Sequence, residues 1–371
     1  MSIQSLVEIS RFYGANPDYV LAGGGNTSWK DGDILYVKGS GTSLAEAVPE
    51  AFVKMDRKAL ARIWENRYPE ASAERESAVL ADMMAARLPG EENRPSVETL
   101  LHDILPFAFV VHLHPALVNG LTCSRQGEAA MKEIFGDEAA VWIPQTNPGY
   151  ILSQQVKNAM DAFAAKHGNQ AAVIFLQNHG VFAGADSVSR IKEIYTEIMG
   201  KIGGWIKKQP DFSGESRDAS GAVAAELRQT LAGLAGGTVA FLCNNEIAAL
   251  VQDRASFAPV SSAFTPDHIV YAGSDPLFTE AKTGAALGEA WKNHTAKTGR
   301  NPKIVAVQGL GVFGATATEK AAALALELFR DAARVAAYTE SFGGPSFMDA
   351  DKIDFINNWE VERFRSGVST K

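Results

Sequence analysis

Residues 94–117 read Arg-Pro-Ser-Val-Glu-Thr-Leu-Leu-His-Asp-Ile-Leu-Pro-Phe-Ala-Phe-Val-Val-His-Leu-His-Pro-Ala-Leu. The first half predicts a short helix that carries Glu98 and is capped by Ser96 or Thr99. Residues 107–113 form an apolar, β-branched run of strand length, which a proline soon closes. The stretch therefore predicts a helix followed directly by a strand.

Two histidines at the end of this strand have a spacing that suits metal ligands. Side chains alternate across a strand, so His112 and His114 point to the same face. With Glu98 just upstream and a third histidine from elsewhere, they would meet the ligand requirement of a catalytic zinc or a similar divalent ion. A His-x-His pair also occurs on surfaces and in cores that hold no metal. The pair alone leaves both interpretations open.

A second apolar strand supplies the third histidine. Residues 173–176, Val-Ile-Phe-Leu, are a continuous apolar run that is typical of a buried strand. His179 follows where this strand ends, in an Asn-His-Gly turn at residues 178–180. Taken singly, it could be a hydrogen-bonded core histidine. Taken with the earlier pair, it favours a metal site with three histidines.

Two loops near the N-terminus are rich in glycine and hydroxyl side chains. Residues 23–28 read Gly-Gly-Gly-Asn-Thr-Ser, residues 38–42 read Lys-Gly-Ser-Gly-Thr, and a predicted hairpin with an Asp-Gly turn joins them. Free backbone N–H groups and hydroxyls of this kind suit an anion such as a sugar phosphate. Ordinary tight turns explain the loops about as well, and neither loop matches a complete Walker or Rossmann pattern.

The composition is that of a soluble globular enzyme. The chain has 371 residues, of which 46% are hydrophobic and 21% charged, and this length predicts two domains. Lys and Arg number 35 against 43 Asp and Glu, which gives a net charge of -8. No basic stripe stands out, so we expect no nucleic-acid partner.

Cysteine usage and the lack of targeting signals predict the cellular compartment. The two cysteines, Cys123 and Cys243, lie far apart in the sequence, which argues against a disulfide framework. The N-terminal residues do not resemble a signal peptide, and no apolar run reaches the length of a membrane span. We therefore expect a cytoplasmic protein with no membrane partner.

Hydrophobic periodicity predicts several helices around these strands. Each predicted helix has an apolar face at helical spacing and is bounded by proline, glycine or a capping residue. Their ranges are 3–13, 52–68, 72–88, 117–135, 151–167 and 187–206.

The second half of the chain repeats part of the first. Residues 173–182 align without a gap with residues 304–313, Ile-Val-Ala-Val-Gln-Gly-Leu-Gly-Val-Phe, and a predicted helix follows each. The repeat keeps the strand and the turn but loses the chemistry, because Leu310 takes the position of His179. A shortened relative of the first half, without metal ligands, explains this pattern.

The predicted domain boundary lies in a polar stretch. Residues 207–221 contain proline, glycine, serine and aspartate, and they predict a linker. A weaker echo pairs residues 33–40 with residues 268–274. We predict a metal-binding catalytic domain at residues 1–210 and a shortened, metal-free copy at residues 222–371.

Five short motifs, in this order along the chain, resemble the class II aldolase/adducin family. They are Gly-Asn-Thr-Ser at 25–28, Ser-Gly at 40–41, Pro-Ser-Val-Glu at 95–98, His-Leu-His-Pro at 112–115 and Asn-His-Gly at 178–180. The family includes fuculose- and rhamnulose-1-phosphate aldolases and ribulose-5-phosphate 4-epimerase. The likeness covers roughly the first half to 60% of the chain, judged against usual domain sizes. It is nearest to the aldolase part of bifunctional rhamnulose aldolase/dehydrogenase proteins.

The resemblance implies an α/β fold of three layers, in which helices flank a mixed or antiparallel central sheet. It also implies a homo-oligomer and a zinc ion, or another divalent ion such as manganese or cobalt. His112, His114 and His179 would hold the ion, and Glu98 would act as a weak fourth ligand and as the acid/base. The substrate's phosphate or its polar equivalent would be bound by Asn26, Ser40, Gly41 and Ser96.

Two positions depart from the family pattern. Val97 stands where the fuculose-phosphate aldolases have a phosphate-binding serine. Gln145 stands at the position of a catalytic tyrosine, which Tyr150 could replace. These departures put a phosphorylated substrate and the tyrosine's role in question.

The resemblance implies a metal-dependent aldolase that cleaves or condenses a ketose or a ketose-1-phosphate through an enediolate. Two alternative functions occur among related proteins. A sugar-phosphate epimerase or a decarboxylase would share the same metal chemistry, and an adducin-like module would bind without catalysis.

Overall fold

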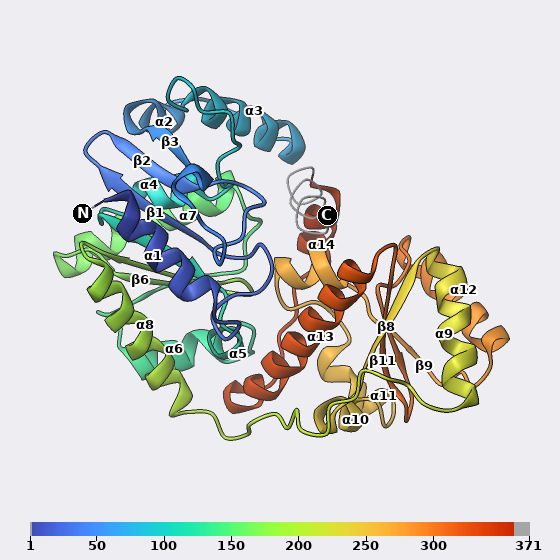
Figure 1. The fold of residues 1–371 in the computed structure, drawn as a ribbon. Helices are drawn as coiled ribbons and strands as arrows, with labels where there is room; N and C mark the ends of the chain where they lie inside the picture. Colours follow the sequence, from blue (N-terminus) through green and yellow to red (C-terminus); the bar gives the residue numbers. More distant parts are fainter. Residues whose placement is uncertain (1, 360–371) are drawn as a thin grey trace. The chain divides into compact units, whose positions relative to one another are not determined.

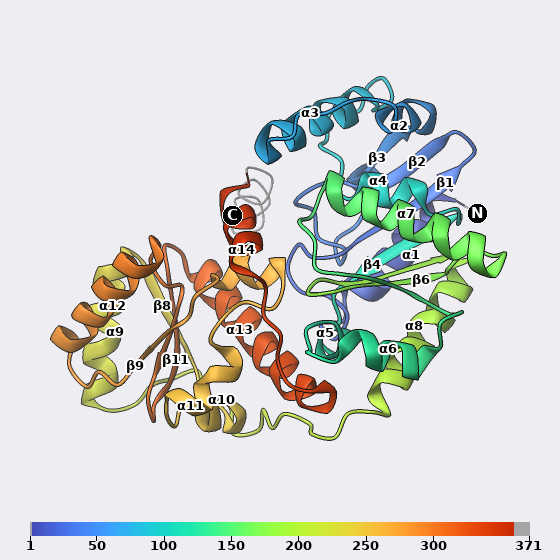
Figure 2. The same ribbon diagram turned by 180° about the vertical axis from the view of Figure 1, so that it is seen from behind.

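The computed structural model describes residues 2–359 of the chain, and these form two compact units (Figures 1 and 2). The first unit contains residues 2–122, 127–205 and 358–359, and the second contains residues 123–126 and 206–357. Among the described residues, no helix has both the length and the apolar character needed to cross a membrane.

The first unit is built on a sheet of seven strands in the order β3-β2-β1-β4-β7-β6-β5. Neighbouring strands run antiparallel except for β5 and β6, which are parallel, so the sheet is mixed as predicted. The strands are β1 Asn26–Asp31, β2 Ile34–Lys38, β3 Phe52–Asp56, β4 Phe109–Leu113, β5 Val141–Ile143, β6 Val173–Leu176 and β7 Gly180–Ala185.

Helices cover both faces of this sheet and give the predicted three layers. Helices α1 and α8 lie over one face (Figure 1), and α4 and α7 lie over the opposite face (Figure 2). The apolar side of α7 packs with α4 and the strands into one buried cluster. The helices are α1 Ile3–Gly14, η1 Pro49–Ala51, α2 Arg57–Ile63, α3 Ser72–Ala85, α4 Thr99–Ile104, α5 Ala116–Thr122, α6 Gly127–Phe135, α7 Tyr150–His167 and α8 Val188–Gly203.

Two predicted helices have the wrong extent. The predicted helix at residues 52–68 begins as a strand, because every residue of Phe52–Asp56 pairs with β2 and the apolar side chains of this segment enter the core. Tertiary pairing overrides the local helical periodicity here. The predicted helix at residues 117–135 is broken into α5 and α6 by residues 123–126.

The sheet of the second unit reproduces part of the first. Its order is β8-β11-β10-β9, antiparallel except for the parallel pair β9 and β10, which matches the order and directions of β4-β7-β6-β5. Its elements are α9 Ala222–Ala235, β8 Thr238–Leu242, α10 Asn245–Leu250, α11 Arg254–Phe257, η2 Ala258–Val260, η3 His268–Ala272, β9 Leu277–Thr279, α12 Gly284–Thr298, β10 Ile304–Val307, β11 Gly311–Thr316, α13 Glu319–Thr339 and η4 Glu340–Phe342. Helix α14, Ala350–Asn358, follows.

The turn between the last two strands is also repeated, bond for bond. In the first unit, three backbone N–H groups of the turn donate to the residues that end β5, α5 and β6: Gln177 N to Ile143 O (2.9 Å), Asn178 N to Thr122 O (3.1 Å) and His179 N to Leu176 O (3.2 Å). In the second unit, the corresponding bonds are Gln308 N to Thr279 O (2.9 Å), Gly309 N to Val251 O (2.8 Å) and Leu310 N to Val307 O (3.0 Å).

The weaker predicted echo is wrong. Residues 34–38 form the strand β2, whereas residues 268–272 form the π-type helical turn η3. Two segments that share a short apolar pattern thus adopt different structures, because their surroundings differ.

A buried lysine fixes the end of α4. Lys30 on β1 donates through Nζ to Leu105 O (2.7 Å) and Phe107 O (2.9 Å), which follow the last residue of that helix. Burial lowers the pKa of Lys30 from 10.5 to about 7, with nearby Asp103 and Asp186 opposing and Arg57 adding to the shift. The lysine is therefore held partly uncharged near neutral pH.

Replacing this lysine should change the pH dependence of stability. Between about pH 7 and pH 10.5 the unfolded chain holds a proton on Lys30 that the folded protein has lost. The unfolded state binds more protons there, so the free energy of unfolding rises with pH, by up to about 1.4 kcal/mol per pH unit. Lys30→Met should lose this slope. Urea unfolding at several pH values measures it, and an unchanged slope would contradict the lowered pKa.

Candidate metal centre

The three predicted metal-binding histidines lie together where β4 ends and β7 begins, near the middle of the sheet. β4 pairs with β7 so that His112 stands opposite Phe182, and the turn between β6 and β7 brings His179 to the same place. The Nε2 atom of His112 is 2.8 Å from that of His114 and 3.4 Å from that of His179. One ring nitrogen from each of the three lies within 4.8 Å of the other two, which suits a single metal ion.

The turn that carries His179 needs its two neighbours. Asn178 adopts a left-handed conformation with φ of 56°, which asparagine tolerates better than most residues. A Cβ on Gly180 would lie 2.5 Å from Leu113 O and 2.7 Å from His114 Cδ2. Glycine therefore lets the turn approach the histidine pair.

Hydrogen bonding sets the tautomer of the central histidine. Nδ1 of the fully buried His112 is 3.1 Å from the backbone oxygen of Val181, which can only accept. Nδ1 therefore donates, and Nε2 presents a lone pair to the cluster. The ring also stacks on Phe182 at 4.0 Å between centroids, which fixes its plane.

Glu98, the N-cap residue of α4, closes the cluster. Its Oε2 is 3.5 Å from His112 Nε2, and its Oε1 is 3.6 Å from His179 Nε2. Only 5% of Glu98 is exposed, and Oε1 has no hydrogen-bond partner among the described residues. A buried carboxylate oxygen beside converging imidazole nitrogens is stabilised by a cation, so these residues fit a divalent metal.

Two of the predicted substrate-binding residues contact Glu98. Asn26 Nδ2 donates to Glu98 Oε2 (2.6 Å) and to Ser96 Oγ (3.3 Å). Ser96 Oγ also accepts from the backbone N–H of Glu98 (3.2 Å). The loop with Ser40 and Gly41 lies alongside, where Ser40 N donates to the backbone oxygen of the residue before Pro95 (2.8 Å). The structure thus joins Asn26 and Ser96 directly to the centre and places the other loop next to them.

Gln145 supports the turn of the third histidine. Its Nε2 donates to Asn178 Oδ1 (2.8 Å), and its backbone N–H donates to Gln177 Oε1 (3.1 Å). Sequence reasoning noted only that a tyrosine was missing at this position. The amide side chains at 177 and 178, next to a histidine, were the available signal for such a contact.

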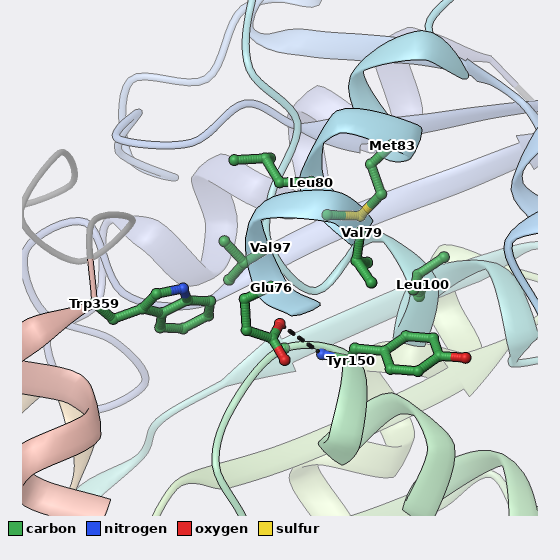
Figure 3. Close-up of a pocket in the computed structure, with 9 residues that line it drawn as sticks. Glu76, Val79, Leu80, Met83, Val97, Leu100, Tyr150 and Trp359 are labelled. Atoms are coloured by element: carbon green, nitrogen blue, oxygen red, sulfur yellow. Dashed lines mark hydrogen bonds between the residues drawn. The ribbon is translucent and has the colours of Figure 1, made fainter. Parts of the chain in front are cut away.

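The ring of Tyr150, which could replace the missing tyrosine, lies in a hydrophobic cluster. Its ring packs against Trp64 and Tyr68 in a hydrophobic cluster that contains none of the three histidines. Figure 3 shows it lining a pocket with Val97 and Trp359, where its backbone N–H donates to Glu76 Oε2 at 3.1 Å. The alternative in which Tyr150 replaces the catalytic tyrosine gains no support.

Residues 4–198, just over half of the chain, match the family model described as Class II Aldolase and Adducin N-terminal domain. The chain belongs to this family. A curated relative, the uncharacterized oxidoreductase YuxG of Bacillus subtilis, is 28% identical over 193 residues, which are 48% of this chain. The chain spans about a quarter of that relative's length, since the match covers 26% of it.

Two solved structures described as aldolases are similar to just over half of the chain. The N-terminal class II aldolase domain of a conserved protein from Thermoplasma acidophilum is 28% identical, with a TM-score of 0.48 over 56% of this chain and 94% of that one. L-Fuculose-1-phosphate aldolase from Thermus thermophilus is 13% identical, with a TM-score of 0.35 over 54% of this chain and 90% of that one.

Substituting any one of the three histidines should strongly weaken metal binding at this candidate centre. We expect about one divalent ion per chain, and His112→Ala, His114→Ala and His179→Ala should each lower its affinity by more than about 100-fold. Metal analysis after dialysis against a weak chelator measures this. His167→Ala is the control, because His167 ends α7 and packs on Phe163. Equal metal content in all four variants would contradict the site.

Gly180→Ala should weaken metal binding by steric displacement alone. The added methyl must push Leu113 or His114 aside, so we expect a loss of about 1–3 kcal/mol of stability and a lower metal affinity. Gly200→Ala in α8 is the matched control. It meets nothing within 4 Å and should be neutral or stabilising by up to about 1 kcal/mol. Calorimetry measures the stability of both variants, and metal titration measures their metal affinity. Equal values for the two variants would contradict the steric role of Gly180.

Proposed function

We propose that this chain is a metal-dependent aldolase that cleaves or condenses a ketose or ketose-1-phosphate through an enediolate. The observation that carries the proposal is Glu98 Oε1, a buried carboxylate oxygen without a hydrogen-bond partner among the described residues, beside His179. A group that exchanges a proton with a substrate must be within reach and not already engaged. Family membership narrows the reaction to the chemistry that class II aldolases and their relatives share.

The metal and the carboxylate have separate tasks. His112, His114 and His179 would hold zinc, or manganese or cobalt in its place. When bound, the ion supplies Lewis-acid stabilisation of negative charge on the substrate oxygens, worth several kcal/mol as a rough expectation. Glu98 moves a proton between the substrate carbon and solvent. Its Oε2 is held by Asn26, so Oε1 is the atom that carries the proton.

The substrate's polar end is assigned to Asn26, Ser40, Gly41 and Ser96. Ser96 and Asn26 lie next to the carboxylate, and the loop with Ser40 and Gly41 is hydrogen-bonded to the backbone just before Ser96. Val97 lines the pocket in Figure 3, and its side chain offers no donor at the position where the resemblance implies a phosphate-binding serine. This favours a sugar whose end at Val97 is not phosphorylated.

Other reactions of the family use the same centre. An epimerase or decarboxylase would share the ligands, and glutamate rather than aspartate at position 98 favours the aldolase. A non-catalytic adducin-like module has no use for the three histidines and Glu98. Their convergence on one point argues against it.

We also propose that residues 222–371 are a shortened copy of the domain at residues 1–210, and that the copy binds no metal. The pairing of β8 with β11 gives the positions that correspond to the ligands. Phe241, Cys243 and Leu310 stand there in place of His112, His114 and His179. A homo-oligomer and a cytoplasmic location remain part of the proposal.

A retro-aldol screen tests the function. Ketose-1-phosphates and unphosphorylated keto-sugar acids are incubated with the metal-loaded protein, and aldehyde release is followed. Wild type should cleave at least one of them and His112→Ala none. Epimerised or decarboxylated products without cleavage would replace the aldolase with the alternative. No turnover by a fully metal-loaded protein would favour the binding module.

Glu98→Gln should separate proton transfer from metal binding. Glutamine keeps the size and Asn26 contact of the side chain but cannot shuttle a proton, so kcat should fall by about 10²- to 10⁴-fold. The three histidines remain, so the metal content should stay close to that of wild type. Exchange of the substrate's carbon-bound hydrogen with deuterated water, followed by NMR, measures the step directly. Unchanged exchange would assign the acid/base role elsewhere.

A further inference from the structure

A chain of four polar side chains runs from the core of the first unit to Glu98. His102 on α4 is fully buried; its Nδ1 lies 2.7 Å from Ser28 Oγ, and its Nε2 contacts Asn26 Oδ1. Asn26 in turn donates through Nδ2 to Glu98 Oε2 at 2.6 Å. Asn26 and Ser28 are two residues apart on β1, so both face α4.

The direction of every bond in this chain is determined by its last member. A carboxylate oxygen only accepts, so Asn26 must present Nδ2 to Glu98 and Oδ1 to His102. Oδ1 also only accepts, and therefore the proton of the His102 ring is on Nε2. With one ring proton there, Nδ1 accepts from the hydroxyl of Ser28.

The ring of His102 is held neutral by its surroundings. Burial lowers its pKa well below 6.5, and the charges of Lys30 and Lys38 lower it further. A neutral imidazole carries a single N–H, so it has a donor side and an acceptor side. The neutral form therefore makes Ser28 the donor to Nδ1, whereas an imidazolium would donate from both nitrogens and Ser28 would accept.

We propose that His102 is a positioning residue: as the Nε2–H tautomer it holds the Asn26 amide in the orientation that occupies Glu98 Oε2 and leaves Glu98 Oε1 for proton transfer. The effect on proton transfer rests on the proposed function, whereas the tautomer rests on the geometry of the hydrogen bonds alone. Without the Nε2–H donor, Asn26 Oδ1 loses its partner, and the amide is held only through Nδ2 by Glu98 and Ser96. The amide can then shift, and Glu98 Oε2 is no longer held in a fixed place beside the histidines.

Packing alone does not account for this arrangement. The ring of His102 meets Phe182 edge-on at 5.5 Å between centroids, and an apolar side chain of similar size would make that contact as well. A residue that only fills space can be exchanged for leucine at a cost in stability. A positioning residue also changes kcat and is rescued by a side chain with the same donor.

The first test measures the tautomer and needs no substrate. The full-length protein, labelled with ¹⁵N-histidine, is examined by NMR with and without zinc, and the His102 signals are assigned by their loss in His102→Gln. We expect a protonated Nε2 and an unprotonated Nδ1 from about pH 6 to about pH 8. An Nδ1–H tautomer, or an imidazolium in this range, would overturn the proposal.

The second test compares three variants in the retro-aldol assay. His102→Leu should lower kcat by about 100-fold with KM within about threefold and full zinc content. His102→Gln should recover at least about tenfold, since its amide N–H replaces Nε2–H. Leu101→Ala is the control on the same helix; it removes a buried side chain, lowers Tm and should keep kcat well below that Tm.

The outcomes separate this inference from the proposed function. Wild-type kcat in His102→Leu, or no rescue by glutamine, would overturn the positioning role. If the leucine variant does not fold, the glutamine variant and the NMR measurement still decide. If the wild-type protein cleaves no sugar, the proposed aldolase function is contradicted. The NMR measurement of the His102 tautomer would then support or overturn the proposed hydrogen-bond directions.

Discussion

The register between β4 and β7 is the constraint on which the centre depends. It sets His112 opposite Phe182 and Leu113 opposite Val181. Side chains alternate along a strand, so a slip of one residue would turn His112 and His114 to the other face. The same pairing supplies the Val181 oxygen that holds the His112 tautomer and the Phe182 ring that holds its plane. One backbone pairing thus fixes position, tautomer and orientation.

The sequence predicts the parts of this site that depend on local periodicity. Alternation in a strand places His112 and His114 on one face, and the apolar run before His179 marks a second strand end. The strand at Phe52–Asp56 escapes such reasoning, because only its pairing with β2 distinguishes it from a helix. Contacts between distant segments, such as Gln145 with Asn178, leave no periodic signal in the sequence.

The second unit shows what the backbone requires by itself. It keeps the strand order, the turn and the turn's hydrogen bonds while Phe241, Cys243 and Leu310 stand at the positions of the histidines. The fold therefore forms without imidazoles there. Burying one histidine fully and two partly beside a carboxylate costs desolvation free energy that apolar side chains avoid. Their presence in the first unit has to be explained by chemistry and not by folding.

The same argument extends to the polar side chains behind Glu98. A buried network stabilises a structure only when every donor meets an acceptor, and a single reversed amide leaves two groups in conflict. In this chain the order runs from Ser28 through His102 and Asn26 to the carboxylate, with one direction that satisfies all four. The carboxylate sets that direction, and burial of His102 keeps its ring neutral, so that Ser28 is the donor to Nδ1. Core packing on one side of the sheet is thereby coupled to the carboxylate that lies beside the three histidines.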